Sequence, residues 1–257
     1  MIDVHTHLLP GVDDGSPAAE HSAVVLARMA GQGVTHVVCT PHLRASRAAE
    51  APCEDHLRLL DALRVLTGPS PVLFPGWEIM LDVSAVDLSA PVLSLGGSQA
   101  RLVEFPRRGL PVDATEQLLR LRMCGVVPVV AHPERYSGCT IDTLLAWREL
   151  GAVIQCDAFA LLGAGPTTSF ARSMLEHGLV DILASDNHGD RRSLSAANQW
   201  MEEIGAKEQG HVLTLENPQR LLADRPLVPV APVRFENGVV ARLKSLLFGR
   251  RERVDES

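Results

Sequence analysis

Two histidines near the start of the chain have the spacing of a metal-binding pair. His5 and His7 end a short apolar run that begins at Ile2, and an acidic loop, PGVDDG, follows directly and contains Asp14. Residues i and i+2 of a strand point to the same face, so we expect the two imidazoles to lie side by side. Imidazole and carboxylate groups together are typical ligands of divalent transition metals. The first fourteen residues therefore predict part of a metal site.

Residues of the same kind follow the other predicted strands. Six strands end in histidine, aspartate or glutamate. In a parallel α/β barrel these ends meet at one rim, where such enzymes have their active sites. Burying so many carboxylates and imidazoles without a compensating cation would cost several kcal/mol for each group, whereas a metal cluster satisfies them together. The candidate ligands are His5, His7, Asp14, His42, Glu78, Glu104, His132, Asp186 and His188.

This ligand set contains no thiolate, which limits both the metal and the chemistry. The candidates are more than one ion needs and are enough for three, and their nitrogen and oxygen donors suit Mn²⁺, Fe, Co or Zn. The five cysteines form no CxxC pair. None of them is followed six positions later by arginine, which excludes cysteine-based phosphatase chemistry.

The other histidines do not follow strand ends in this way. Some fall on predicted helices, one starts a strand and one lies near a late loop, so we expect surface or core packing roles for them. They are His21, His36, His56, His177 and His211.

Short apolar runs alternate with helical patterns along the chain. The predicted strands are Ile2–His7, His36–Thr40, Val72–Ile79, Arg101–Phe105, Val127–Ala131, Val153–Cys156 and Ile182–Ser185. A first helix is expected between Ser16 and Gly33, and others around Leu118, Leu144 and Phe170. Such βαβα repetition predicts an α/β fold with a parallel sheet covered by helices. The chain has no glycine-rich dinucleotide fingerprint and no Walker A loop, which favours a barrel over a doubly wound sheet.

Composition and charge limit the classes of function. The chain has 257 residues, of which 46 % are apolar, and a formal net charge of −7, which argues against nucleic acid as its main partner. We expect residues 1–232 to form one domain and residues 233–257 to form a terminal helix with a solvated end. The sequence has no signal stretch and no apolar run long enough to span a membrane, so we expect a cytoplasmic protein.

Several motifs occur in an order that resembles a known superfamily. They are HTH at the first strand, TPH at the second, an isolated glutamate, then HP and finally SDNH. This order resembles the polymerase and histidinol phosphatase (PHP) superfamily. Within it, the chain is most similar to the bacterial manganese-dependent protein-tyrosine phosphatases of capsule and exopolysaccharide operons. The stretches that carry this resemblance span residues 2–222 and read IDVHTHLLPGVDDGS, THVVCTPH, GWEI, LVEFP, AHPERY, ILASDNHG and LENPQRLL.

The resemblance implies a distorted seven-stranded (β/α) TIM-like barrel that holds three divalent metal ions, with manganese expected first. It assigns His5, His7, Glu78 and Asp186 to the first ion, Glu78, Glu104 and His132 to the second, and Asp14, His42 and His188 to the third. Glu104 favours the tyrosine phosphatases, because histidinol phosphatase relatives tend to have histidine there.

Arginines are expected to bind the phosphate. Arg135, three residues after the HP histidine, is the best candidate for a forked contact, and the family supports an arginine there. A second arginine usually follows SDNH, which points to Arg192 or Arg191. Arg107 and Arg108 are candidate rim contacts. We assign Arg135 and Arg192 to catalysis, and Arg135, Arg192 and Arg107 to substrate binding.

Three positions depart from the family pattern. Trp77 replaces the usual glutamine, Met80 stands where an arginine is often found, and Leu43 replaces a second histidine after TPH. We expect Trp77 and Met80 to lie near the mouth of the site, where they would affect substrate preference.

The resemblance implies a metal-dependent protein-tyrosine phosphatase that acts on a bacterial tyrosine autokinase and regulates capsule or exopolysaccharide synthesis. The first alternative is a small-molecule phosphomonoesterase of the same superfamily, such as histidinol phosphatase. A nuclease-like relative is disfavoured by the acidic charge. An inactive phosphoprotein-binding scaffold is disfavoured by the intact ligand set.

Overall fold

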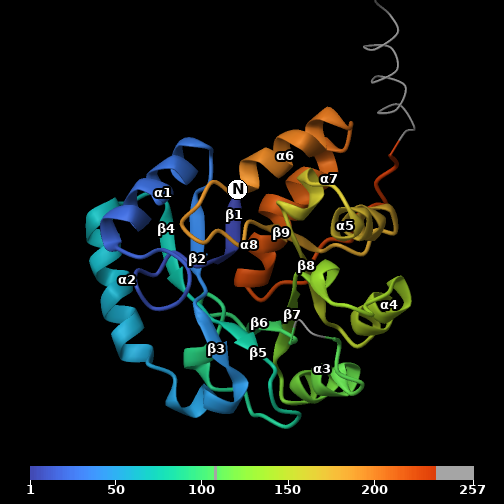
Figure 1. Ribbon diagram of the computed structural model, residues 1–257, viewed down its shortest axis with the longest axis horizontal. Helices are drawn as coiled ribbons and strands as arrows, with labels where there is room; N and C mark the ends of the chain where they lie inside the picture. Colours follow the sequence, from blue (N-terminus) through green and yellow to red (C-terminus); the bar gives the residue numbers. More distant parts are fainter. Residues whose placement is uncertain (107–108, 236–257) are drawn as a thin grey trace, which may run out of the picture.

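Parallel strands form the centre of the molecule, and helices lie around them (Figure 1). The computed structural model describes residues 1–106 and 109–235, and every structural statement below concerns these residues. The strands are β1 (Ile2–Thr6), β2 (His36–Cys39), β3 (His42–Arg44), β4 (Val72–Pro75), β5 (Glu78–Met80), β6 (Ala100–Glu104), β7 (Val127–Ala131), β8 (Val153–Asp157) and β9 (Ile182–Ala184).

The main helices alternate with the strands, as the sequence predicts. They are α1 (Ala19–Gly31), α2 (Cys53–Thr67), α3 (Ala114–Met123), α4 (Ile141–Glu149), α5 (Pro166–Glu176), α6 (Leu194–Glu203), α7 (Lys207–His211) and α8 (Asn217–Leu222). Short helical turns complete the chain: η1 (Ala45–Glu50), η2 (Pro91–Leu93), η3 (Pro133–Arg135), η4 (Ala160–Leu162) and η5 (Val212–Glu216).

The strands form two sheets, and every pairing is parallel. One sheet has the order β1-β2-β4 and the other the order β3-β5-β6-β7-β8-β9. The end of β1 also approaches the end of β9, where the His7 amide donates to the Asn187 carbonyl at 2.8 Å. The predicted α/β class with parallel sheets is confirmed. The hydrogen bonds describe two sheets, so a closed seven-stranded barrel stays a prediction.

Two divisions between strands differ from the prediction, and the other predicted strand ends agree with the structure to within one residue. The predicted strand Val72–Ile79 is two strands, and β3 was not expected. The chain bends at Pro41 and at Pro75-Gly76, where proline offers no amide hydrogen to continue a ladder. Gly76 packs so closely that a Cβ atom there would lie 2.8 Å from Val38 Cγ1. The bends carry β3 and β5 into the second sheet, which brings their first residues next to the other strand ends.

Alternation along the strands directs polar groups towards the site. Leu102 and Ala184 are fully buried, and each stands two residues before a carboxylate, Glu104 and Asp186 respectively. Because alternate residues of a strand share a face, Glu104 at the end of β6 continues the buried apolar row of that strand. The fold therefore fixes where the polar strand ends point.

The described chain remains packed up to its last residues. Val233 is buried, and its amide donates to the Leu175 carbonyl at 3.0 Å. The predicted terminal helix lies outside the described residues from position 236 onward. Among residues 1–106 and 109–235, no helix combines the length and the apolar character that crossing a membrane requires.

Candidate metal centre

The backbone is strained at two of the strand ends that carry candidate ligands. His132 follows β7 with φ of 34°, and Asp186 follows β9 with φ of 48°, both in the left-handed region. Such conformations cost of order 1–3 kcal/mol each for residues other than glycine, and they concentrate at functional sites. Both turns direct a buried side chain towards the same space.

His5 and His7 lie against each other and against one carboxylate oxygen. Their Nε2 atoms are 3.2 Å apart, and each is 3.2 Å from Asp186 Oδ1. All three side chains are buried. The predicted side-by-side arrangement of the HxH pair is confirmed.

Glu78 is the carboxylate on which the histidines converge. Its Oε1 atom is 2.7 Å from His132 Nε2 and 3.4 Å from His5 Nε2. Its Oε2 atom is 3.2 Å from His7 Nε2 and 2.9 Å from His42 Nδ1. One buried carboxylate thus contacts four imidazoles from three strand ends.

Glu104, the last residue of β6, closes the inner part of this cluster. Its carboxylate oxygens lie 3.7 Å from His42 Nδ1 and 3.9 Å from His132 Nε2. Because Glu104 is buried beside Glu78, two carboxylates share the inner wall of the site.

The outer part of the cluster opens to solvent. Asp14 Oδ1 lies 3.3 Å from His42 Nε2 and 3.4 Å from His188 Nε2. The side chain of Asp14 is 69 % exposed, whereas that of His188 is 15 % exposed. Asp14 therefore marks the mouth, and the buried groups lie behind it.

All nine candidate ligands belong to groups whose donor atoms lie within 4.8 Å of one another. The groups are His7, Asp14, His42 and His188; His5, Glu78 and His132; His5, His7 and Asp186; and His42, Glu78 and Glu104. Donor atoms at such separations in a set of imidazoles and carboxylates fit shared divalent cations.

The electrostatics of the cluster also fit cations. Burial by itself lowers the pKa of His5, but Glu78 and Asp186 outweigh it and raise that pKa to about 9. Burial by itself raises the pKa of Asp186 and of Glu78, but the neighbouring imidazoles hold both well below their usual values. The carboxylates thus remain charged and require positive charge beside them, which protons supply in the metal-free protein.

Two residues outside the predicted ligand set orient the HxH pair. Asp13 Oδ2 is 2.7 Å from His7 Nδ1, and Gln155 Oε1 is 3.0 Å from His5 Nδ1. Each contact leaves the Nε2 atom of the imidazole facing the cluster. Asp13 has a visible signal in the DDG motif. Gln155 is a buried polar residue between Ile154 and Cys156 of β8, and that is a weak signal.

We expect Asp13→Asn to weaken metal binding by about 10- to 100-fold, because a carboxylate behind a ligating histidine fixes its ring and raises its basicity. Isothermal titration of the stripped protein with Mn²⁺ measures the effect. Asp87→Asn, at an exposed loop position, is the matched control. Unchanged affinity in Asp13→Asn would remove this orienting role.

Gly15 allows the acidic loop to lie directly on the first strand end. A Cβ atom at this position would fall 2.1 Å from the His7 carbonyl oxygen and 2.4 Å from its Cβ. The Ser16 amide also donates to that carbonyl at 2.9 Å. No side chain fits between the loop and His7.

We expect Gly15→Ala to displace the loop and lower the free energy of unfolding by about 3 kcal/mol, the upper range for overpacking. The melting temperature and the bound metal per chain would both fall. Gly31→Ala in α1 is the control, since a Cβ there meets open space. A Gly15→Ala protein that unfolds and binds Mn²⁺ like the wild type would contradict the close packing.

Two predicted arginines contact Asp186 on its other oxygen. Arg135 Nη2 is 2.7 Å from Asp186 Oδ2 and also forms an ion pair with Asp157. Arg192 Nη1 is 3.1 Å from the same Oδ2 atom. Arg191 is exposed. Arg107 and its neighbour at position 108 lie outside the described residues.

The expectation that Trp77 lies near the mouth is wrong. Trp77 is 4 % exposed, its ring stacks on His56 at 4.5 Å, and its Nε1 donates to the Val92 carbonyl at 3.1 Å. Trp77 lies in the link between β4 and β5, and its contacts are with His56 and Val92. Met80 is partly buried at the end of β5.

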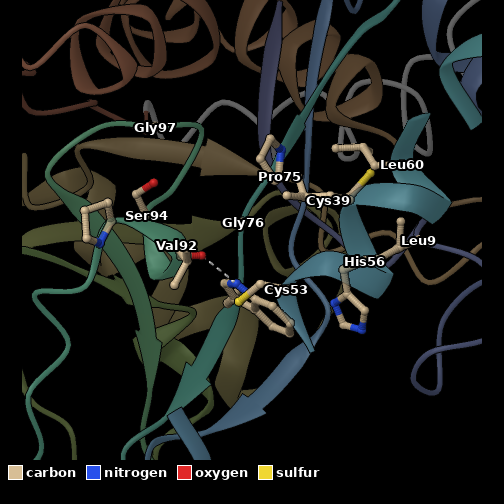
Figure 2. A pocket seen from close by; sticks show the side chains of 13 residues that line it. Leu9, Cys39, Cys53, His56, Leu60, Pro75, Gly76, Val92, Ser94 and Gly97 are labelled. Atoms are coloured by element: carbon tan, nitrogen blue, oxygen red, sulfur yellow. Dashed lines mark hydrogen bonds between the residues drawn. The ribbon is translucent and has the colours of Figure 1, made fainter. Parts of the chain in front are cut away.

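Trp77 lines a separate, mainly apolar cavity of about 150 Å³. Figure 2 shows His56 and Leu60 on one side and Val92 and Ser94 on the other. None of the nine candidate ligands lines it. The cavity and the metal cluster are therefore distinct features.

The remaining histidines stay outside the cluster, as expected. His21 Nε2 contacts the Gly189 carbonyl at 2.6 Å, and His177 Nδ1 contacts the Ser173 carbonyl at 2.8 Å. No group of donor atoms in the described part of the chain includes any of the five.

Comparison with known proteins agrees with this geometry. Residues 1–223 match the family described as capsular polysaccharide synthesis, CpsB/CapC. The chain belongs to this family. It is 28 % identical over 251 residues to the tyrosine-protein phosphatase YwqE of Bacillus subtilis, which covers 91 % of this chain and 97 % of YwqE.

Two further CpsB/CapC comparisons cover nearly the whole chain. The tyrosine-protein phosphatase CpsB of Streptococcus pneumoniae is 28 % identical over 247 residues, which is 88 % of this chain and 99 % of CpsB. Among solved structures, a chain from the work on Bacillus subtilis YwqE and Streptococcus pneumoniae CpsB, described as unique metal-dependent tyrosine phosphatases, superposes with a TM-score of 0.76 at 26 % identity. This match covers 91 % of this chain and 100 % of the other. The predicted family is confirmed.

Proposed function

We propose that this protein is a metal-dependent phosphatase that hydrolyses phosphotyrosine in proteins. The observation that carries the proposal is the convergence of imidazoles and carboxylates from six strand ends on Glu78 and Asp186. The metal-dependent tyrosine phosphatases with a similar fold and similar sequence support the reaction class.

The proposed ligands hold three divalent ions, with Mn²⁺ as the first choice. His5, His7, Glu78 and Asp186 would hold the first ion, Glu78, Glu104 and His132 the second, and Asp14, His42 and His188 the third. Four carboxylates with three divalent ions leave a formal charge of about +2, which suits a phosphomonoester dianion.

The chain's own groups would bind and orient the phosphate. Divalent cations, when bound, supply a water nucleophile that ionises near pH 7 and positive charge for the phosphoryl oxygens. Arg135 offers a planar set of five donors, and its two carboxylate contacts use Nη2 alone. Arg192 would add a second guanidinium on the same side. A tyrosine leaving group, with a pKa of about 10, needs less protonation than an alkyl alcohol.

The proposed substrate is the phosphorylated tail of a bacterial tyrosine autokinase in the cytoplasm, and the regulated process is capsule or exopolysaccharide synthesis. The description of the matching family supports the process. The names of the relatives support a phosphotyrosine protein as substrate.

Phosphate release from a phosphotyrosine peptide and from histidinol phosphate tests the proposal. The stripped protein, reloaded with Mn²⁺, is expected to hydrolyse the peptide, and His5→Ala and His42→Ala are expected to abolish this turnover. Turnover of histidinol phosphate alone would replace the proposal by the small-molecule alternative. Metal binding without turnover of either substrate would contradict both.

A further inference from the structure

A chain of ionic contacts leads from the metal cluster to the end of β8. Asp186 Oδ2 contacts Arg135 Nη2 at 2.7 Å, and the same nitrogen contacts Asp157 Oδ2. Asp157 is the last residue of β8 and is 4 % exposed. Because β8 lies between β7 and β9, the residues that follow Asp157 emerge between the ends that carry His132 and Asp186.

Asp157 also fixes the backbone of the next aromatic residue. Its Oδ1 atom accepts a hydrogen bond of 2.8 Å from the Phe159 amide. On either side, Ala158 and Leu161 are fully buried, and the Ala158 amide donates to the Ala184 carbonyl at 2.8 Å. Phe159 is therefore held in place by packed neighbours.

Phe159 is nevertheless 54 % exposed. Among residues 1–106 and 109–235 it is the one large aromatic side chain in the exposed class, since the tryptophans, the tyrosine and the other phenylalanines are buried or partly buried. Folding leaves this ring in water although its flanking residues are buried. An apolar ring held at the rim of a polar cluster is a feature of recognition surfaces.

We propose that Phe159 is a specificity residue that packs against the aromatic ring of the phosphorylated side chain, and that Asp157 is a positioning residue for both Phe159 and Arg135. The inference rests on the proposed phosphatase function. One carboxylate would thus join a phosphate contact and a ring contact into a single recognition unit for aryl phosphates.

This arrangement predicts a preference that depends on the ring and not on the phosphate. Packing of two aromatic rings contributes about 3- to 10-fold in affinity. An alkyl phosphate would use the arginine and the cluster but gain nothing from Phe159. Removing the ring should therefore affect aryl ligands selectively.

Binding of two non-hydrolysable probes, phenylphosphonate and methylphosphonate, to the Mn²⁺-loaded protein tests the proposal by isothermal titration calorimetry. Phe159→Ala is expected to lower the affinity for phenylphosphonate by about 3- to 10-fold and to leave the affinity for methylphosphonate unchanged. Phe159→Tyr is expected to restore the aryl preference. Leu119→Ala, at an exposed leucine of α3, is the control and should change neither affinity.

Equal affinities of wild type and Phe159→Ala for phenylphosphonate, or an equal loss for both probes, would overturn the role of Phe159. Asp157→Asn is expected to raise KM for a phosphotyrosine peptide more than it lowers kcat. It is also expected to lower the affinity for both phosphonates, because Arg135 loses its ionic contact with Asp157. Unchanged affinity for both phosphonates would overturn the positioning role of Asp157. The phosphonates report binding without turnover, so a failure of the phosphatase proposal is distinguishable from a failure of this one.

Discussion

Glu78→Gln is expected to lower the turnover of a phosphotyrosine peptide by about 1000-fold, the upper range for losing one electrostatic group of an active site. The substitution keeps the size of the side chain. It removes the charge that four imidazoles face and places an amide group against their nitrogens. Bound metal per chain should fall as well, because Glu78 would bridge two ions. Steady-state phosphate release and metal analysis measure both effects.

A matched variant separates this effect from a general loss of glutamate. Glu176→Gln changes an exposed residue of α5 and should leave turnover and metal content unchanged. A Glu78→Gln protein that retains wild-type activity with a full metal content would contradict the central position of Glu78.

Metal removal is expected to lower the melting temperature by roughly 10 °C or more. An ion present at 1,000 times its Kd adds about 4 kcal/mol for each site, and a protein of this size loses roughly 2–4 °C for each kcal/mol. Without ions, protonated imidazoles offset the charge of the buried Glu78 and Asp186 carboxylates, and Arg135 and Arg192 also contact Asp186. Differential scanning calorimetry with and without a chelator measures the difference.

The metal dependence of the melting temperature should grow with pH. The pKa of His5 in the metal-free protein is raised to about 9, above its ordinary value of 6.5. The stabilisation from its proton is therefore complete below pH 6.5 and is lost as pH rises towards 9. Ions replace these protons, and their binding is favoured as pH rises. The chelated protein should thus lose stability between pH 6.5 and 9 while the loaded protein loses less.

Glu78→Gln again provides the control, because it should reduce the difference between loaded and chelated protein. Identical melting temperatures with and without Mn²⁺ at pH 8 would contradict a structural contribution from bound ions.

Much of the site could be predicted from sequence because its residues follow strand ends. The rule that alternate strand residues share a face predicts the paired imidazoles of His5 and His7. Parallel topology predicts that Glu104 and His132 lie at the same rim. These inferences need only the order of strands. They do not need the exact strand boundaries, which differ from the prediction at β3 and β5.

The rest depends on contacts that no local pattern specifies. Gln155 meets His5 across 150 positions of the sequence, and Asp157 meets Arg135 only because η3 turns back over β8. Trp77 adjoins Glu78 in the sequence, yet its ring stacks on His56 and its Nε1 donates to the Val92 carbonyl. Proximity in sequence to a ligand therefore did not predict proximity in space.

Phosphate release from a phosphotyrosine peptide by the stripped protein as Mn²⁺ is added back, with bound metal counted by elemental analysis, tests the metal-dependent reaction most directly. We expect no turnover in the stripped protein and a rate that rises until about three ions are bound per chain. Turnover that persists without bound metal would contradict a metal-dependent phosphatase built on the nine strand-end residues.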